Sequence, residues 1–128
     1  MGQPITTKST GICFAFPDVC LTPAPPSPSP VPIPYPNIGQ LQSVQSEAGT
    51  VLVGGNPVVT SNSEIPTTTG DEAGSASPTK GKVQFVTFSQ SVFAEGHNVV
   101  RMFDTTTQNG GNAVGQVLGG VPNVLVGG

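Results

Sequence analysis

Eight of the fourteen prolines in this 128-residue chain lie in one 14-residue stretch, residues 23–36 (PAPPSPSPVPIPYP). Proline fixes φ and lacks a backbone N–H, so this stretch is excluded from helices and from central strands. We therefore expect polyproline-II structure or a chain of turns, forming a loop within the domain. A tether for an SH3-type domain is the alternative interpretation.

Composition narrows the fold class further. Glycine (17) and proline (14) make 31 residues, about twice ordinary usage, whereas charged residues make only 9%. The scarcity of helix-forming residues at helical spacing excludes a bundle or coiled coil, and the absence of glycine at every third position excludes collagen. With 35% hydrophobic residues, a charge-rich disordered tail is also excluded. We expect one low-charge, turn-rich all-β domain over residues 1–128, with residues 1–11 loosely ordered.

Charge and hydropathy exclude several partners. The net charge is −3 and the chain has no basic patch, so we expect no nucleic-acid binding, which needs several cationic contacts. The first ten residues lack the apolar core of a signal peptide. No run approaches the ~18 apolar residues of a membrane helix. We expect neither a signal peptide nor a transmembrane helix.

An internal repeat indicates how the strands are organised. Residues 51–55 (VLVGG) recur identically at 124–128, and residues 51–59 align without gaps with residues 92–100. The copies start at 51, 92 and 124, and each reads as a strand followed by a glycine-containing turn. They predict three short β-hairpin units around a common axis, joined by long Gly/Pro loops. Residues 61–80 are predicted to be such a loop, and residues 113–118 a short helical turn.

Cys13 and Cys20 are too few for a disulfide framework. A single bridge across the short loop between them and two separate buried thiols are both open at this point. The second interpretation is favoured because free cysteine is among the most buried residue types.

Several stretches together carry a family resemblance. They are residues 16–20 (FPDVC), 32–38 (PIPYPNI), 69–74 (TGDEAG), 81–83 (GKV), 95–101 (EGHNVVR) and 121–127 (VPNVLVG). In this order they resemble the PAAR-like domain family, and the last stretch resembles the proline-alanine-alanine-arginine (PAAR) repeat itself. The resemblance implies a small, cone-shaped, β-rich fold. Such proteins cap the trimeric valine-glycine repeat (VgrG) spike of bacterial contractile injection machines, chiefly type VI secretion systems.

The resemblance also implies a function. We expect a non-enzymatic spike-tip protein, one copy per spike trimer, that sharpens the spike for membrane puncture and carries effector or adaptor proteins. It would reside in the bacterial cytoplasm during assembly and then leave on the spike, crossing membranes only transiently. The alternatives are an effector or toxin of the same system, and a β-rich adhesin or virion surface module. Because tips fused to toxins are longer chains, we expect any toxin to be a separate polypeptide.

The expected contacts with the spike are apolar residues of the repeated units and of the proline-rich stretch. They are Val31, Ile33, Tyr35, Val51, Val53, Val92 and Val124. Exposed strand edges at such positions become useful when a partner covers them.

PAAR domains often hold zinc through histidines and a cysteine, but this chain has one histidine and two cysteines. The ligand set is therefore incomplete, and we expect no cofactor. Cys20 is the first candidate ligand, and Cys13 and His97 are weaker ones. His97 aligns with Asn56 in the repeat and is predicted to be a solvated turn residue. No nucleophile–base–acid set is evident, and Asp71 with its neighbour reads as a turn.

Overall fold

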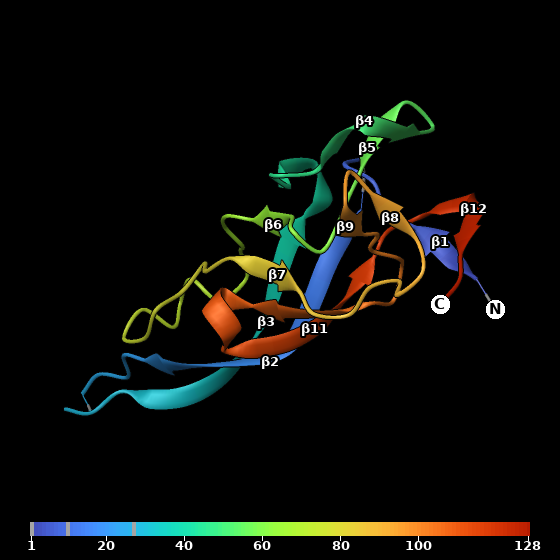
Figure 1. Ribbon diagram of the computed structural model, residues 1–128. Helices are drawn as coiled ribbons and strands as arrows, with labels where there is room; N and C mark the ends of the chain where they lie inside the picture. The colour runs from blue at the N-terminus through green and yellow to red at the C-terminus, as the bar shows by residue number, and fades with distance from the viewer. Residues whose placement is uncertain (1, 10, 27) are drawn as a thin grey trace.

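The computed structural model describes residues 2–9, 11–26 and 28–128, and these form an all-β protein, as expected (Figure 1). The strands are β1 (Gln3–Ile5), β2 (Ile12–Thr22), β3 (Val31–Gln40), β4 (Ala48–Val53), β5 (Asn56–Val58), β6 (Glu64–Ile65), β7 (Val83–Phe85), β8 (Phe93–Ala94), β9 (His97–Asn98), β10 (Thr105–Gln108), β11 (Ala113–Leu118) and β12 (Val121–Val126). Two short 3-10 turns are η1 (Leu41–Ser43) and η2 (Asn109–Gly111). No helix in these ranges is long and apolar enough to cross a membrane.

Six strands form one antiparallel sheet in the order β3-β2-β11-β10-β7-β6. Its inner face covers the main hydrophobic core, made of Cys13, Leu41, Val44, Val59, Ile65, Val83, Phe85, Val100 and Val117. The stretch predicted to be a helical turn is strand β11, whose burial alternates residue by residue. The segment forms a strand and not a helical turn because it pairs with β10 on one side and with β2 on the other.

A β-bulge in β2 changes which of its side chains face inward. Before the bulge, Cys13 and Ala15 are buried, and after it Asp18 and Cys20 are buried. The register with β3 shifts between Ala15 and Asp18, so that one extra residue of β2 is accommodated at Phe16–Pro17. Without that extra residue, the strand's two-residue period would turn Asp18 and Cys20 outward.

The second half of the proline-rich stretch is strand β3, so the expectation of polyproline-II structure or turns is wrong for residues 31–36. The strand lies at the edge of the sheet, where proline is tolerated. Pro32 and Pro34 lie opposite Leu21 and Val19 of β2, and alternate residues of a strand direct their backbone groups to opposite sides. The prolines therefore occupy positions whose missing N–H groups would point away from β2, so that pairing with β2 loses no hydrogen bond.

Three two-stranded ribbons complete the fold: β4–β5, β8–β9 and β1–β12. The first two are hairpins built on the repeat copies at 51 and 92. The third copy, at 124, forms no hairpin of its own, because β12 pairs with β1 from the other end of the chain. The N-terminal segment is thus ordered by this pairing, with Ile5, Thr6 and Thr7 buried, and not loose as expected. Residues 1 and 10 of that segment lie outside the described residues.

The three ribbons are related by a pseudo-threefold axis. The backbone N–H of Thr6 donates to the carbonyl of Val100, that of Val100 to Val59, and that of Val59 back to Thr6, each at 3.0 Å. All three residues are fully buried. A second set of equivalent bonds surrounds this ring: Lys8 to Pro57 at 2.8 Å, Ser61 to Asn98 at 2.8 Å and Met102 to Pro4 at 2.7 Å. The chain therefore repeats one strand arrangement three times around a closed centre.

A second core lies among the ribbons and is made of Ile5, Ala48, Val58, Ala94, Val99 and Val126. Three of its members come from equivalent positions, since Ile5, Val58 and Val99 each precede a residue of the hydrogen-bonded ring. We call this part of the molecule, β1, β4, β5, β8, β9 and β12, the ribbon end.

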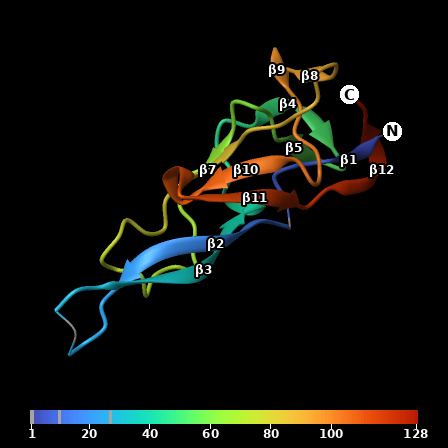
Figure 2. The ribbon, with the colours of Figure 1, turned by 90° about the horizontal axis from the view of Figure 1, so that it is seen from below.

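The hairpin of β2 and β3 extends away from the ribbon end in both views (Figures 1 and 2). We call residues 16–36 the arm. The chain termini lie at the ribbon end, so the arm projects from the opposite end of the molecule (Figure 1). The predicted loop 61–80 is irregular apart from β6, and part of it packs beside the arm.

Candidate functional site

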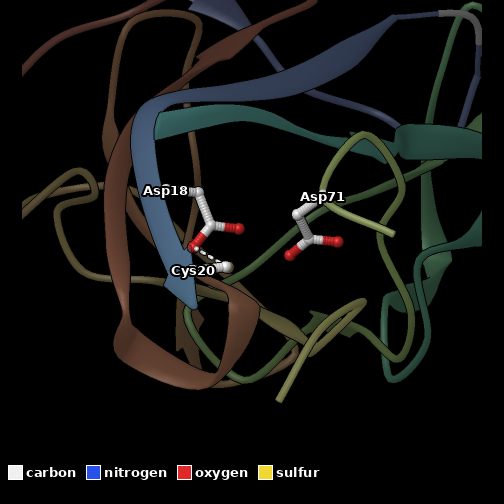
Figure 3. Close-up of side chains that lie close together, drawn as sticks. All are labelled: Asp18, Cys20 and Asp71. Atoms are coloured by element: carbon white, nitrogen blue, oxygen red, sulfur yellow. Dashed lines mark hydrogen bonds between the residues drawn. The ribbon is translucent and has the colours of Figure 1, made fainter. Parts of the chain in front are cut away.

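The motifs that carry the family resemblance converge on one polar cluster at the base of the arm. Strand β2 supplies Asp18 and Cys20, β3 supplies Asn37, the loop after β6 supplies Asp71, and the turn after β10 supplies Asn109 and Asn112. Asp18, Cys20 and Asp71 are completely buried, and their side chains lie close together (Figure 3).

Asp18 is the most heavily hydrogen-bonded member of the cluster. Its Oδ1 accepts from Asn112 Nδ2 at 2.6 Å, from Asn109 Nδ2 at 3.2 Å and from the Cys20 thiol at 3.5 Å. Its Oδ2 accepts from Asn37 Nδ2 at 3.2 Å. Burial opposes ionisation here, but hydrogen bonds from Asp71, Asn112 and Asn109 hold the pKa of Asp18 below its usual value.

Asp71 lies on the other side of Asn37, whose Nδ2 donates to its Oδ2 at 3.3 Å. The backbone N–H of Lys80 donates to both of its carboxylate oxygens, at 3.1 and 3.3 Å. Burial, followed by the hydrogen bond and charge of Asp18, raises the pKa of Asp71 to about 6. No cationic side chain pairs with either carboxylate among the described residues. Because the pKa of Asp71 is raised and that of Asp18 is lowered, Asp71 is the acid that takes up a proton first as the pH falls.

Glycine allows the loop to approach the cluster. A Cβ at Gly74 would overlap the Cβ of Cys20 and stand 3.2 Å from Tyr35 Cε2. A Cβ at Gly70 would stand 2.6 Å from the Pro36 carbonyl, and Gly70 also has a φ of +111°. The two glycines of the TGDEAG stretch thus allow the loop backbone to lie close to β2 and β3, which brings Asp71 into the cluster.

A second layer of amides fixes the cluster's orientation. Gln108 Nε2 donates to Asn37 Oδ1 at 2.9 Å and to the Asn37 carbonyl at 3.0 Å, which leaves the Asn37 amide N–H groups facing the carboxylates. Asn109 Oδ1 accepts from the Gly81 N–H at 2.8 Å, so its amide N–H groups likewise face Asp18.

The cluster does not fit a zinc ion well. The ligand atoms of Asp18, Cys20 and Asp71 lie within 4.8 Å of one another, which brings three acceptor groups together. However, the amide N–H groups of three asparagines point at Asp18, where a cation would be repelled. Every buried side-chain nitrogen and oxygen in the described part of the chain has a hydrogen-bond partner. The arrangement is that of a satisfied hydrogen-bond network.

The weaker metal candidates lie apart from this cluster. Cys13 belongs to the main hydrophobic core, where burial raises the pKa of its thiol to about 12. His97 is exposed in the β8–β9 ribbon, next to the Glu95–Gly96 turn, in agreement with the prediction of a solvated residue. Both cysteines are free and buried, so the interpretation as two separate thiols is confirmed.

The residues expected to contact the spike divide between the two ends of the molecule. Val51, Val53, Val92 and Val124 lie on ribbon strands or beside them. Val31, Ile33 and Tyr35 lie on the arm, where they pair with the inward-facing residues of β2. Tyr35 is half-buried, and its hydroxyl group lies 2.7 Å from the Thr22 hydroxyl. No single flat surface includes both sets.

Sequence reasoning missed the most exposed apolar side chains of the ribbon end. Leu52, Phe93 and Leu125 are 57%, 57% and 61% exposed. They pair with Pro57, Asn98 and Pro4, respectively, which are the equivalent positions of the three ribbons. The signal that locates them is the repeat itself, since each is the second residue of a copy. The pseudo-threefold symmetry therefore places three apolar side chains at equivalent exposed positions.

Comparison with known proteins agrees with this arrangement of motifs. Residues 11–115 match the toxin PAAR-like domain. The chain belongs to the toxin PAAR-like domain family. The match includes the arm, the polar cluster and most of the sheet, together with two of the three ribbons.

One curated relative is the DNase toxin Tse7 of Pseudomonas aeruginosa, which is 43% identical over 105 residues. The matched part covers 74% of this chain but 27% of the relative, so the chain spans about a quarter of that protein. No solved structure matches the chain. The expectation of a non-enzymatic protein is corrected by this finding, because a relative with the same PAAR-like part is an enzyme.

Proposed function

We propose that this chain is the PAAR-like delivery module of a toxin exported by a type VI secretion system or a related contractile machine. The family match and the toxin relative support an effector over a purely structural tip. The module would attach the toxin to the trimeric VgrG-type spike, one module per trimer. The toxin would then leave the bacterium on the spike.

The pseudo-threefold ribbon end is the observation that carries the proposal. The closed ring of hydrogen bonds among Thr6, Val59 and Val100 gives a single chain the symmetry of a trimer. A protein with threefold symmetry presents three identical surfaces, and only a partner with matching symmetry contacts all three in the same way. The ribbon end has the symmetry that matches a trimeric partner, whereas the arm does not.

The contacts at this end are apolar. Leu52, Phe93 and Leu125 are exposed at equivalent positions, and Val51 and Val92 lie beside the first two. Burying apolar side chains at the centre of an interface supplies most of its binding free energy. We propose that these residues, with Val53 and Val124, seat the module on the spike.

Co-purification with a VgrG-type trimer tests the docking. We expect one module per three spike chains, and we expect the triple variant L52D/F93D/L125D to lose binding. V114D is the matched control, because Val114 is 63% exposed but lies on β11, outside the ribbon end. Equal copy number, or unchanged binding by the triple variant, would contradict this docking surface.

DNA cleavage is the second function that we propose, as the activity of the delivered toxin. It rests on the DNase toxin relative alone. Incubation of plasmid DNA and Mg²⁺ with the toxin that co-purifies with this module measures it, and the module alone is the control. Nicked or degraded plasmid with the toxin supports the proposal, and intact plasmid contradicts it.

A further inference from the structure

One Asn–Gly pair occurs in the chain, Asn109–Gly110, and it forms part of η2. Asparagine is a chemically labile residue, and its deamidation is fastest before glycine, which has no side chain to hinder its own backbone nitrogen. That nitrogen attacks Cγ of the asparagine, and the amide nitrogen leaves as ammonia. The resulting succinimide ring takes up water and opens to aspartate or isoaspartate. The pair is thus a candidate modification site, and its surroundings decide whether it reacts.

The side-chain amide of Asn109 is held at both of its polar atoms. Its Oδ1 accepts from the Gly81 N–H at 2.8 Å, and its Nδ2 donates to Asp18 Oδ1 at 3.2 Å and to the Pro78 carbonyl at 3.0 Å. The residue is only 6% exposed. Because deamidation removes Nδ2, the reaction has to break the hydrogen bonds that this nitrogen donates.

The attacking nitrogen is covered as well. The backbone N–H of Gly110 donates to the Lys82 carbonyl at 3.2 Å. Gly81 packs directly on the peptide bond that joins Asn109 to Gly110, since a Cβ at Gly81 would stand 2.6 Å from the Asn109 carbonyl carbon and 2.7 Å from the Gly110 nitrogen. We call residues 78–82 the cover. The cover occupies both reacting groups, so the nitrogen is free to attack only when the cover moves away.

Deamidation would prevent the cover from closing again. An ionised aspartate has only acceptors where the amide donated, and they would face the Asp18 carboxylate and the Pro78 carbonyl, which are acceptors too. Asp18 and Asp71 are already buried, and no cationic side chain pairs with them in the part of the chain that the structure describes. A third carboxylate at position 109 therefore makes the closed cluster costly.

We propose that Asn109–Gly110 is a self-modification site, which the closed cover protects and which deamidates once the cover opens. Because the product does not restore the hydrogen bonds of the closed cluster, each conversion makes the opening permanent. The reactants are the chain and water, so the step needs no cofactor and no second protein. The proposal concerns the module by itself and does not depend on docking to a spike.

Peptide mapping by mass spectrometry measures the conversion, because a carboxyl group differs in mass from an amide. At pH 8, we expect Asn109 to convert at least about tenfold more slowly in the folded protein than in guanidinium chloride. In guanidinium chloride, the variant G110A should slow conversion about tenfold, since its methyl group hinders the attacking nitrogen. Equal rates in folded and unfolded protein would overturn the shielding, and an unchanged rate in G110A would overturn the succinimide route.

A variant of the cover gives the second measurement. Gly81→Ala places a methyl group where the Asn109–Gly110 peptide leaves no room, so the cover has to shift. In buffer without denaturant, we expect this variant to convert Asn109 about tenfold faster than the parent chain. Gly49→Ala is the matched control and should convert at the parent rate, since its Cβ has nothing within 4 Å. Equal conversion in the two variants, both folded by circular dichroism, would overturn the proposal; if Gly81→Ala does not fold, the parent in buffer and in denaturant still decides.

The variant N109D tests the consequence of conversion without waiting for the reaction. We expect its equilibrium constant for unfolding in urea to exceed that of N62D by about tenfold or more. N62D is the matched control, because Asn62 is exposed. If N109D is as stable as N62D, conversion does not keep the cover open and the proposal is wrong.

Discussion

Asp18 and Asp71 come from a strand and a loop, yet their carboxylates lie within one buried cluster and are bridged by Asn37 Nδ2, at 3.2 and 3.3 Å. Protonation of Asp71, whose pKa is raised to about 6, removes the charge repulsion between the two buried carboxylates. The loop that carries Asp71 is thus attached to β2 by a contact whose strength depends on protonation.

The first prediction concerns the pH dependence of folding stability. Because the pKa of Asp71 is raised to about 6 in the folded state, its stabilising contribution is present at pH below 3.8 and is lost as the pH rises through 6. The lowered pKa of Asp18 acts in the opposite sense, and its contribution is lost as the pH falls. We expect maximal stability near pH 4, a loss of about 2 kcal/mol between pH 4 and 6, and little further change up to pH 8. Urea unfolding at a series of pH values measures this.

The variant D71N isolates the titration of Asp71. An asparagine at this position still donates a hydrogen bond to Asp18 but carries no charge at any pH, so the loss of stability between pH 4 and 6 should disappear. E72Q is the control, because Glu72 is exposed and bonds to Thr69 and to the Gly70 N–H outside the cluster. A D71N protein with an unchanged pH profile would show that the proton is held elsewhere.

The second prediction tests the close approach of the loop to the cluster. Gly74→Ala places a Cβ against the Cβ of Cys20, so the loop or β2 must move. We expect the variant to lose about 2 kcal/mol of unfolding free energy, as is usual for overpacking a tight site. Gly49→Ala is the control, since a Cβ at Gly49 has nothing within 4 Å. Equal stability of the two variants in urea would contradict the tight contact.

The sequence predicted the all-β class and the positions of two ribbons, because tight glycine turns between β-branched runs are a local signal. It did not predict β3 as a strand, because proline excludes a central strand but is allowed at an edge, and edge position is a property of the whole sheet. The inward orientation of Asp18 and Cys20 was equally hidden, since it depends on the bulge at Phe16–Pro17.

The sequence showed the motifs that supply the polar cluster, but not that their side chains come together. Asn37, Asp71 and Asn109 lie in separate turns or strand ends, and pairing across the sheet brings them together. The pseudo-threefold centre was visible in part, through the repeat copies. Its third unit was incomplete in the sequence because the N-terminal strand supplies the second half.

The third prediction concerns the two thiols. Burial raises the pKa of Cys13 to about 12, and burial together with the Asp18 charge raises that of Cys20 to about 11. The thiolate is the reactive form, so neither cysteine should react with a disulfide reagent at pH 8 in the folded protein. In denaturant, both should react. Reaction of one thiol in the native protein would show that its part of the structure opens readily.

The fourth prediction concerns metal content. Because the amide N–H groups of Asn37, Asn109 and Asn112 face Asp18, we expect less than about a tenth of a zinc ion per chain in protein purified without chelator. Elemental analysis measures it. Stoichiometric zinc that C20S removes and C13S retains would place a metal at the cluster and contradict the hydrogen-bond network.

The last prediction uses the pseudo-threefold relation of the ribbons. Gln3 pairs with Val126 as Asn56 pairs with Val53, so the chain ends lie where the β4–β5 ribbon has its Gly54–Gly55 turn. A circular permutant opened between Gly54 and Gly55, with its original ends joined by a short linker, should fold to nearly the stability of the parent chain, because each equivalent ribbon tolerates an opening at its turn. A permutant opened between β10 and β11 is the comparison and should lose several kcal/mol, since those strands pair at the centre of the sheet. If the two permutants are equally unstable in urea, the ribbons are not energetically equivalent and the symmetry is one of backbone shape alone.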